Sequence, residues 1–179
     1  MLNQITPPRS GSHPPEDALD LLVACHQRIR HFAAAASKLA HAQGATHEEI
    51  RMTAAGVYRY FSVSLPLHEA DEEDTLRPRL DALGDPRVHH ALIAMQDQHK
   101  AIDELLERLL PLVLLLDRNP AAIDQAGGEM CSITKALEEI FRAHLQLEED
   151  VIFPAIRDQL PNETRTAMLA EMQQRRQQG

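Results

Sequence analysis

The sequence predicts an all-α fold, an up-down-up-down antiparallel four-helix bundle followed by a short extra C-terminal helix. Three observations support this prediction. Prolines, glycines and capping residues divide the chain into long segments, and the connections between them are short, so that successive helices are antiparallel. Aromatic residues make up only 3% of the chain. No stretch alternates apolar and polar residues over the length of a strand.

Capping residues and prolines place the helix boundaries. The helices of the bundle are expected within residues 15–160, at about residues 15–43, 46–77, 86–117 and 120–160. Gly44 ends the first helix, and Thr46 with Glu49 forms a capping box that begins the second. We expect a kink at Pro66, because proline removes one backbone donor and clashes with the preceding turn.

The length of 179 residues suits one domain that buries roughly two-thirds of the surface of its unfolded chain. Residues 1–14 are rich in proline, serine and glycine, and we expect them to form a flexible N-terminal tail. Residues 161–179 are polar and rich in glutamine towards their end, which predicts a short C-terminal helix and tail.

Charge and cysteine content exclude several classes of function. The formal net charge is −9, and no basic stripe is present, so nucleic acid is not an expected partner. Cys25 and Cys131 are too few for a disulfide scaffold and are expected to be reduced, with Cys25 as a packed free thiol. The N-terminus lacks the pattern of a secretion signal, and the longest apolar run, residues 109–116, is too short to cross a membrane. We therefore expect a cytoplasmic protein without membrane contact.

An internal repeat carries the chemistry of this sequence. After His68, a glutamate follows at +4, an aliphatic residue at +8 and a proline at +10, and the same offsets follow His144. The residues concerned are Glu72, Leu76 and Pro78 after His68, and Glu148, Ile152 and Pro154 after His144. Side chains four residues apart on an α-helix point in nearly the same direction. The second and fourth helices therefore each direct one imidazole and one carboxylate inward.

The first and third helices each add one histidine. His26 precedes His68 by 42 residues, and His99 precedes His144 by 45. Both His26 and His99 have an isoleucine at +3, so the chain reads as two helical hairpins of related design. Counted from the two hairpin turns, the four histidines reach one level of the bundle if tilt and kinks absorb about 8–9 Å.

Four imidazoles and two carboxylates at one level of a bundle suit a pair of metal ions. Imidazole binds iron, zinc, copper or nickel, and carboxylates favour harder ions and bridge two metals ~3.5–4 Å apart. Two histidines per ion and two bridging glutamates would leave positions for an oxide or hydroxide bridge and for a small exogenous ligand. The metal would also compensate the buried charges of Glu72 and Glu148.

These residues resemble the hemerythrin-like family, the HHE cation-binding domains, over roughly residues 15–160. That family has a lone histidine on helices one and three, and a histidine with a glutamate at +4 on helices two and four. The resemblance implies a non-haem centre of two iron ions, although other divalent metals fit the same donors. The implied ligands are His26 and His68 for one iron, His99 and His144 for the other, and Glu72 and Glu148 as bridges.

Three more acidic residues are candidate ligands. Oxygen-carrying members have a second histidine one turn beyond the third-helix ligand, where this chain has Asp103, which we expect to hold a ligand or a water molecule. Those members also place the fourth-helix carboxylate at +5, the position of Glu149, whereas the internal repeat selects Glu148. Glu69, next to His68, would supply an extra bond in the manner of some family members.

The resemblance implies a protein that binds, stores or senses a small ligand such as O2 or NO, or iron itself. The alternative is a redox enzyme acting on NO or peroxide, or a repair protein for iron-sulfur centres. Members of the repair group carry a cysteine-bearing N-terminal extension, whereas residues 1–14 contain no cysteine. A third hypothesis is a metal-free helical interaction module. Ferritin-like sites use more carboxylates and place glutamate before histidine, so the order seen here argues against ferroxidase storage.

The remaining polar residues do not join this pattern. The histidines expected at the surface are His13, His31, His41, His47, His89 and His90. Asp71, Glu73 and Asp74 are expected to form a solvated face beside Glu72. Aliphatic surface near residues 114–115 suggests a homodimer.

Overall fold

A computed structural model describes residues 15–178, and the predicted N-terminal tail, residues 1–14, lies outside them. The described residues contain helices and turns and no strand, which confirms the all-α prediction. No helix among them is long and apolar enough to cross a membrane.

The first two helices begin at the expected kind of cap. α1 (Ala18–Ala40) starts at Asp17, whose side chain accepts hydrogen bonds from the next backbone amides. Gly44 has a φ of +86° in the following turn, a conformation that glycine adopts without strain. α2 (His47–Arg59) begins with the predicted capping box, in which Thr46 and Glu49 each cap the backbone of the other.

Most of the helical segments belong to long rods that change between α- and π-helical turns. The rod that begins with α2 continues through η1 (Tyr60–Ser64), α3 (Leu65–Ala70), η2 (Asp71–Leu76) and α4 (Arg77–Asp81). The next elements are α5 (Pro86–Arg118), η3 (Pro120–Ala122), α6 (Ile123–Leu147), η4 (Glu148–Ile152) and α7 (Phe153–Gln159). The last is α8 (Asn162–Gln178). Of these, η1, η2 and η4 are π-helical and η3 is a 3-10 turn.

The prolines of the internal repeat follow directly after π-helical turns. The residue before Pro78 donates its backbone N–H to the carbonyl of Glu72, five residues earlier, and the residue before Pro154 donates to Glu148 in the same way. The wider turn keeps the chain helical although proline has no N–H and its ring crowds the preceding turn. Pro66 follows η1 with the same geometry, so a π turn stands where the sequence predicted a kink.

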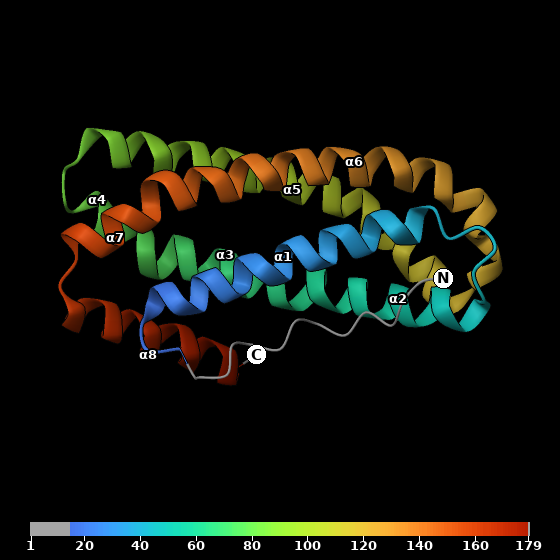
Figure 1. Cartoon of the computed structure of the whole chain (residues 1–179), viewed down its shortest axis with the longest axis horizontal. Coiled ribbons are helices and arrows are strands. Elements are labelled where there is room, and N and C mark those ends of the chain that lie inside the picture. Colours follow the sequence, from blue (N-terminus) through green and yellow to red (C-terminus); the bar gives the residue numbers. More distant parts are fainter. Residues whose placement is uncertain (1–14, 179) are drawn as a thin grey trace.

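The long helices pack side by side around a common core (Figure 1). α1 contacts α2 and α6, and α5 contacts the same two helices. α8 packs along α1 and against η2. The buried apolar residues form two clusters, one with Ile29 and Ile102 and the other with Leu22 and Met95. The polar layer that contains His26 and His99 lies between these two clusters along the helices.

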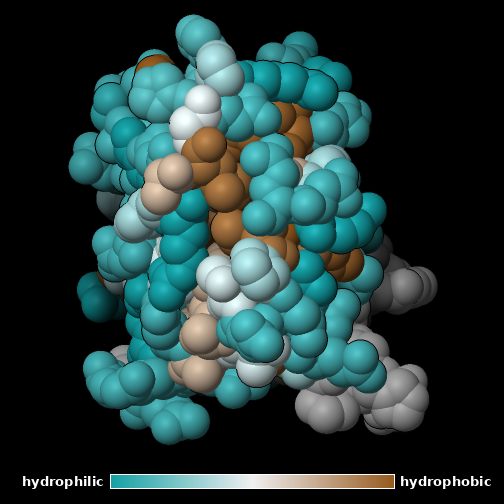
Figure 2. All heavy atoms as spheres, turned by 90° about the vertical axis from the view of Figure 1, so that its left-hand side faces the viewer, coloured by the Kyte–Doolittle hydropathy of each residue, from teal (hydrophilic) through white to brown (hydrophobic). Residues whose placement is uncertain are grey.

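One end of the molecule, where α4 and α7 lie, is viewed directly in Figure 2. Its surface is mostly hydrophilic, with a strip of hydrophobic atoms across the middle. Elsewhere Leu115 is 40% exposed and Leu114 is half-buried, and the homodimer suggested by these leucines stays a prediction.

Candidate metal centre

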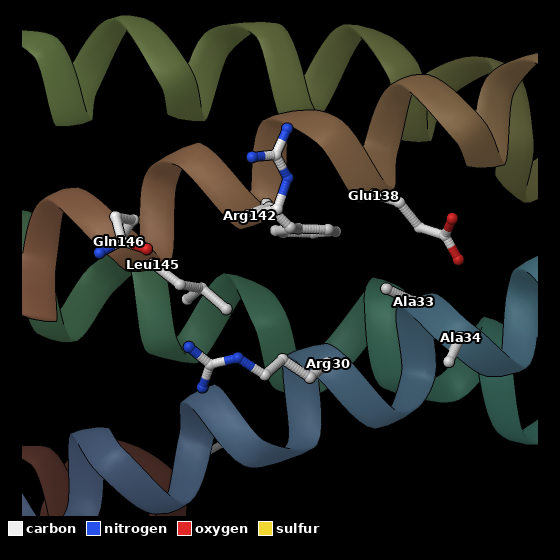
Figure 3. Close-up of a pocket in the computed structure, with 8 residues that line it drawn as sticks. Arg30, Ala33, Ala34, Glu138, Arg142, Leu145 and Gln146 are labelled. Atoms are coloured by element: carbon white, nitrogen blue, oxygen red, sulfur yellow. The ribbon is translucent and has the colours of Figure 1, made fainter.

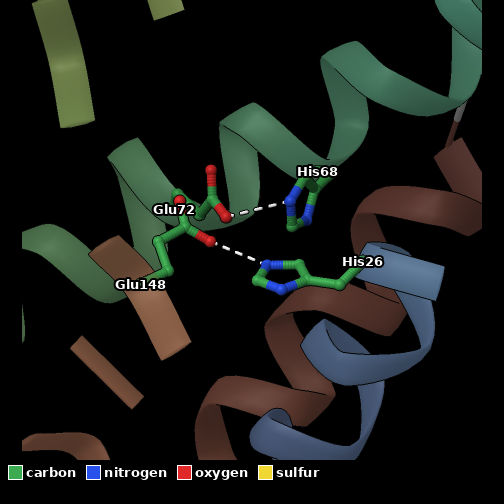
Figure 4. Close-up of side chains that lie close together, drawn as sticks. All are labelled: His26, His68, Glu72 and Glu148. Atoms are coloured by element: carbon green, nitrogen blue, oxygen red, sulfur yellow. Dashed lines mark hydrogen bonds and ion pairs between the residues drawn. The ribbon is translucent and has the colours of Figure 1, made fainter. Parts of the chain in front are cut away.

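The structure brings together the side chains that the repeat selects. Two groups of potential ligand atoms, each within 4.8 Å of one another, share Glu72 and Glu148. The first group is completed by His26 and His68 (Figure 4), and the second by His99 and His144. All of these side chains are buried, the most accessible being His99 at 6%.

Each glutamate divides its two oxygens between the two groups. Oε1 of Glu72 lies 3.0 Å from Nε2 of His68, and Oε2 lies 3.0 Å from Nε2 of His99. Oε2 of Glu148 lies 2.7 Å from Nε2 of His26, and Oε1 lies 3.0 Å from Nε2 of His144. Both carboxylates are therefore placed as bridges between two pairs of imidazoles.

Several donor atoms at the centre lack the hydrogen bonds that buried polar atoms normally have. Among the described residues, both oxygens of Glu72 and the Nε2 atoms of His68 and His99 make none, although they lie about as close as hydrogen-bonded atoms. Leaving such atoms unpaired costs free energy, whereas a cation between them would satisfy all of them. The residues present therefore fit a metal ion.

The charges at the centre shift the pKa values of its members. Burial alone would raise the pKa of Glu72, but the facing His68 and His99 lower it well below its usual range. Burial alone would lower the pKa of His99, but the Glu72 carboxylate raises it to about 9. In His144 burial dominates and the pKa is lowered. The pKa of each group at the centre thus depends on the charges of the groups that face it.

A comparison with models of protein families covers the part of the chain that contains the centre. The model of the hemerythrin HHE cation-binding domain matches residues 17–156. The chain belongs to this family. The match covers every element from α1 to η4 and so includes the whole buried cluster, whereas α8 lies beyond it. Comparisons with curated proteins and with solved structures found no match.

In this HHE domain, a second carboxylate contacts Nδ1 of each lone histidine, His26 and His99, while Nε2 faces the cluster. Nδ1 of His26 lies 2.8 Å from Oε1 of Glu149, and Nδ1 of His99 lies 3.1 Å from Oε1 of Glu73. Each is the residue that follows a glutamate of the cluster, Glu148 or Glu72. Such contacts orient an imidazole and make it a stronger ligand. Glu149 is therefore placed behind a ligand, outside both groups.

Glu73 belongs only in part to the solvated face that the sequence predicted. Its side chain is only 28% exposed, because it is held between His99 and Arg77. The signal that would have identified it is the pair of adjacent glutamates in both halves of the repeat, at Glu72–Glu73 and Glu148–Glu149.

His68 and His144, the histidines followed by a glutamate at +4, also have neighbours on the ring edge away from that glutamate. These neighbours occupy equivalent positions in the two halves of the repeat. Nδ1 of His144 lies 3.2 Å from Oε1 of Gln98, the residue before His99. The residue before His26 is Cys25, and its buried thiol interacts with the ring of His68. Neither Gln98 nor Cys25 stood out from the sequence as a partner of a histidine. The signal available was their shared position before a lone histidine.

Asp71 is the second correction to the expected solvated face. Its side chain is fully buried, and Arg175 and Arg176 of α8 both bind its carboxylate, Arg176 at 2.6 Å. Asp74, by contrast, is exposed as predicted, at 70%. Residues from α8, outside the matched domain, therefore reach the backbone segment that carries Glu72.

Glu69 and Asp103 lie near the second histidine pair but outside both ligand groups. Burial raises the pKa of Glu69 to about 7, with repulsion from Asp103 adding to the shift. Asp103 is largely exposed, and burial together with Glu107 raises the pKa of its carboxyl group although His99 opposes the shift. These two carboxyl groups form an acidic edge beside the centre.

A surface depression of about 380 Å³ lies between α1 and α6 (Figure 3). Arg30 and Arg142 flank it from facing helices, and Phe141 is also among its lining residues. Arg30 also donates to both oxygens of Glu149, at 2.7 and 2.9 Å. This arginine fixes the carboxylate that stands behind His26.

Proposed function

We propose that this protein holds two non-haem iron ions on an up-down-up-down four-helix bundle and uses them to bind, store or sense a small ligand such as O2 or NO. The proposed metal ligands are His26, His68, Glu72, His99, His144 and Glu148. The observation that carries the proposal is the division of each buried glutamate between two histidine pairs.

The composition of the donor set favours iron. Imidazole nitrogen together with carboxylate oxygen suits a metal of intermediate hardness, and thiolates are absent from both ligand groups. With two histidines and two shared carboxylates, each bound iron would have positions open for a small molecule. The protein supplies an apolar surrounding on both sides of the polar layer, which keeps bulk water from the donors.

Elemental analysis tests the metal content. Protein loaded with ferrous iron and freed of excess metal is expected to retain two iron ions per chain and to show a visible charge-transfer band after exposure to air. His26→Ala together with His99→Ala should reduce iron to background. His90→Ala, an exposed histidine on α5, is the matched control and should keep full loading. Less than one metal per chain in the unaltered protein would overturn the proposal.

Titration with the small ligand separates binding from catalysis. Reduced, iron-loaded protein is prepared without oxygen and then mixed with known amounts of NO or O2. The amount of ligand taken up is compared with the protein concentration. A binding or sensing protein takes up no more than about one equivalent per centre and releases it unchanged. Continued consumption beyond that ratio would identify a redox enzyme instead.

A further inference from the structure

The two halves of the centre differ at the residue that faces the Nδ1 edge of His68 in one half and of His144 in the other. Gln98 reaches Nδ1 of His144 with an amide oxygen. Cys25 occupies the corresponding position before His26, but its side chain is shorter and ends in sulfur. As a result, His68 has the sulfur of Cys25, a weak hydrogen-bond acceptor, as its neighbour here, and among the described residues no oxygen bonds its Nδ1, although His68 is only 1% exposed.

A cavity lies at the place that the shorter cysteine leaves open. Its volume is about 190 Å³, well above the ~10–15 Å³ that one water molecule needs. Its lining residues are Cys25, Arg28, Tyr60, Ser64, Leu67, His68 and Arg176. The cavity is therefore lined by His68 and by Cys25 together, whereas Glu72 is not among its lining residues.

The lining of this cavity favours a negatively charged ligand. Two of its residues, Arg28 and Arg176, carry guanidinium groups, and Tyr60 and Ser64 carry hydroxyl groups. Arg176 is held in place by Asp71 at 2.6 Å and by a contact of 3.7 Å with the sulfur of Cys25. A guanidinium group held in this way keeps a fixed positive charge at the wall of the cavity, and that charge attracts an anion. No carboxylate belongs to the described lining.

We propose that this cavity binds a small oxyanion. The anion contacts Nδ1 of His68 in the same way as the Gln98 amide oxygen contacts Nδ1 of His144. One oxygen of the anion accepts a hydrogen bond from Nδ1 of His68, and others face the guanidinium groups. This inference rests on the proposed function in one respect, because a metal on Nε2 leaves the ring proton on Nδ1. Occupancy would then orient one ligand of the first metal position and leave the second unaffected.

The test uses zinc-loaded full-length protein with ¹⁵N-labelled histidine, because zinc is diamagnetic and nitrate is a poor metal ligand. Zinc content is measured first, so that failure of the metal site is seen separately from failure of the anion site. Titration with nitrate is expected to shift the Nδ1 resonance of His68 saturably, while that of His144 stays in place. Equal shifts of both resonances, or no saturation in protein that holds two zinc ions, would overturn the proposal.

Two substitutions at one residue sharpen this test. Cys25→Gln places an amide where Gln98 has one, so nitrate binding should weaken by at least tenfold while zinc content is unchanged. Cys25→Ala leaves the cavity open and should retain nitrate binding, which also excludes modification of the thiol as the cause of the shift. If Cys25→Gln binds nitrate as tightly as Cys25→Ala does, the cavity is not the binding site.

Discussion

Glu149 lies 2.8 Å from Nδ1 of His26, while its neighbour Glu148 lies 2.7 Å from Nε2 of the same ring. Two adjacent residues of one helical rod thus contact opposite edges of one imidazole. Adjacent residues on a helix point about 100° apart, which allows these neighbours at the start of η4 to approach the ring from two sides. Glu72 and Glu73 divide their roles in a related way around His99.

This arrangement predicts that Glu149→Gln weakens metal binding without unfolding the protein. The amide still fills the space, but it lacks the negative charge that strengthens His26 as a ligand, so the affinity for zinc should fall about 10- to 100-fold. Glu73→Gln should act similarly through His99. Competition with a chelator measures the affinity. Glu139→Gln, an exposed glutamate of α6, is the control, and equal affinities in all variants would contradict the prediction.

Metal removal should lower the thermal stability of the protein, because it leaves the buried Glu72 and Glu148 without a cation. Zinc at 100 times its dissociation constant stabilises the folded state by about 2.7 kcal/mol for each site that it fills. For a domain of this size each filled site then corresponds to roughly 5–11 °C in Tm, measured with and without chelator. The double variant His26→Ala with His99→Ala should show no difference between the two conditions. A similar difference in that variant would locate the stabilising metal elsewhere.

Adjacent glycines on α6 provide a matched pair of stability predictions. A Cβ atom on Gly127 would lie 2.9 Å from the carbonyl oxygen of Ala40, so Gly127→Ala should destabilise the protein by about 1–3 kcal/mol. A Cβ atom on Gly128 would meet nothing within 4 Å, and Gly128→Ala should stabilise the helix by up to ~1 kcal/mol. Urea unfolding measures both. Loss of stability in both variants would show that the close approach of α1 is not the cause.

The ion pairs between Asp71 and α8 are expected to hold that helix against the bundle. Asp71→Asn removes the charge that binds Arg175 and Arg176, and we expect a loss of about 1–3 kcal/mol together with faster hydrogen exchange in α8. Asp74→Asn, at an exposed carboxylate 3.7 Å from Arg175, should change stability by less than ~0.5 kcal/mol. Equal rates of amide hydrogen exchange in α8 of the two variants would contradict this prediction.

Local signals in the sequence predicted the helices well. The capping box at Thr46 and Glu49 and the positive φ of Gly44 involve neighbours along the chain, so their chemistry can be read from order alone. The first helix nevertheless ends at Ala40, before the expected boundary. The π turns before Pro66 and Pro78 were not predicted, because helical spacing does not distinguish an inserted residue from a kink.

Charged side chains outside the repeat were harder to predict. Asp71 and Glu73 lie in a run of acidic residues that resembles a solvated surface, and the sequence does not show which distant cation or imidazole each one meets. Asp71 is buried because Arg175 and Arg176 return to it from more than 100 residues away. Such partners are set by how α8 packs.

By itself the sequence determined the register of the centre, because an imidazole and a carboxylate four residues apart must share one face of a helix. The repeat of that spacing selected four side chains, and the single histidines of the first and third helices completed the six that the structure brings together. Only the tertiary structure decided what stands behind each histidine, including the cavity beside Cys25. These contacts join different helices, and their distances depend on helix packing, which the order of residues along one helix does not fix.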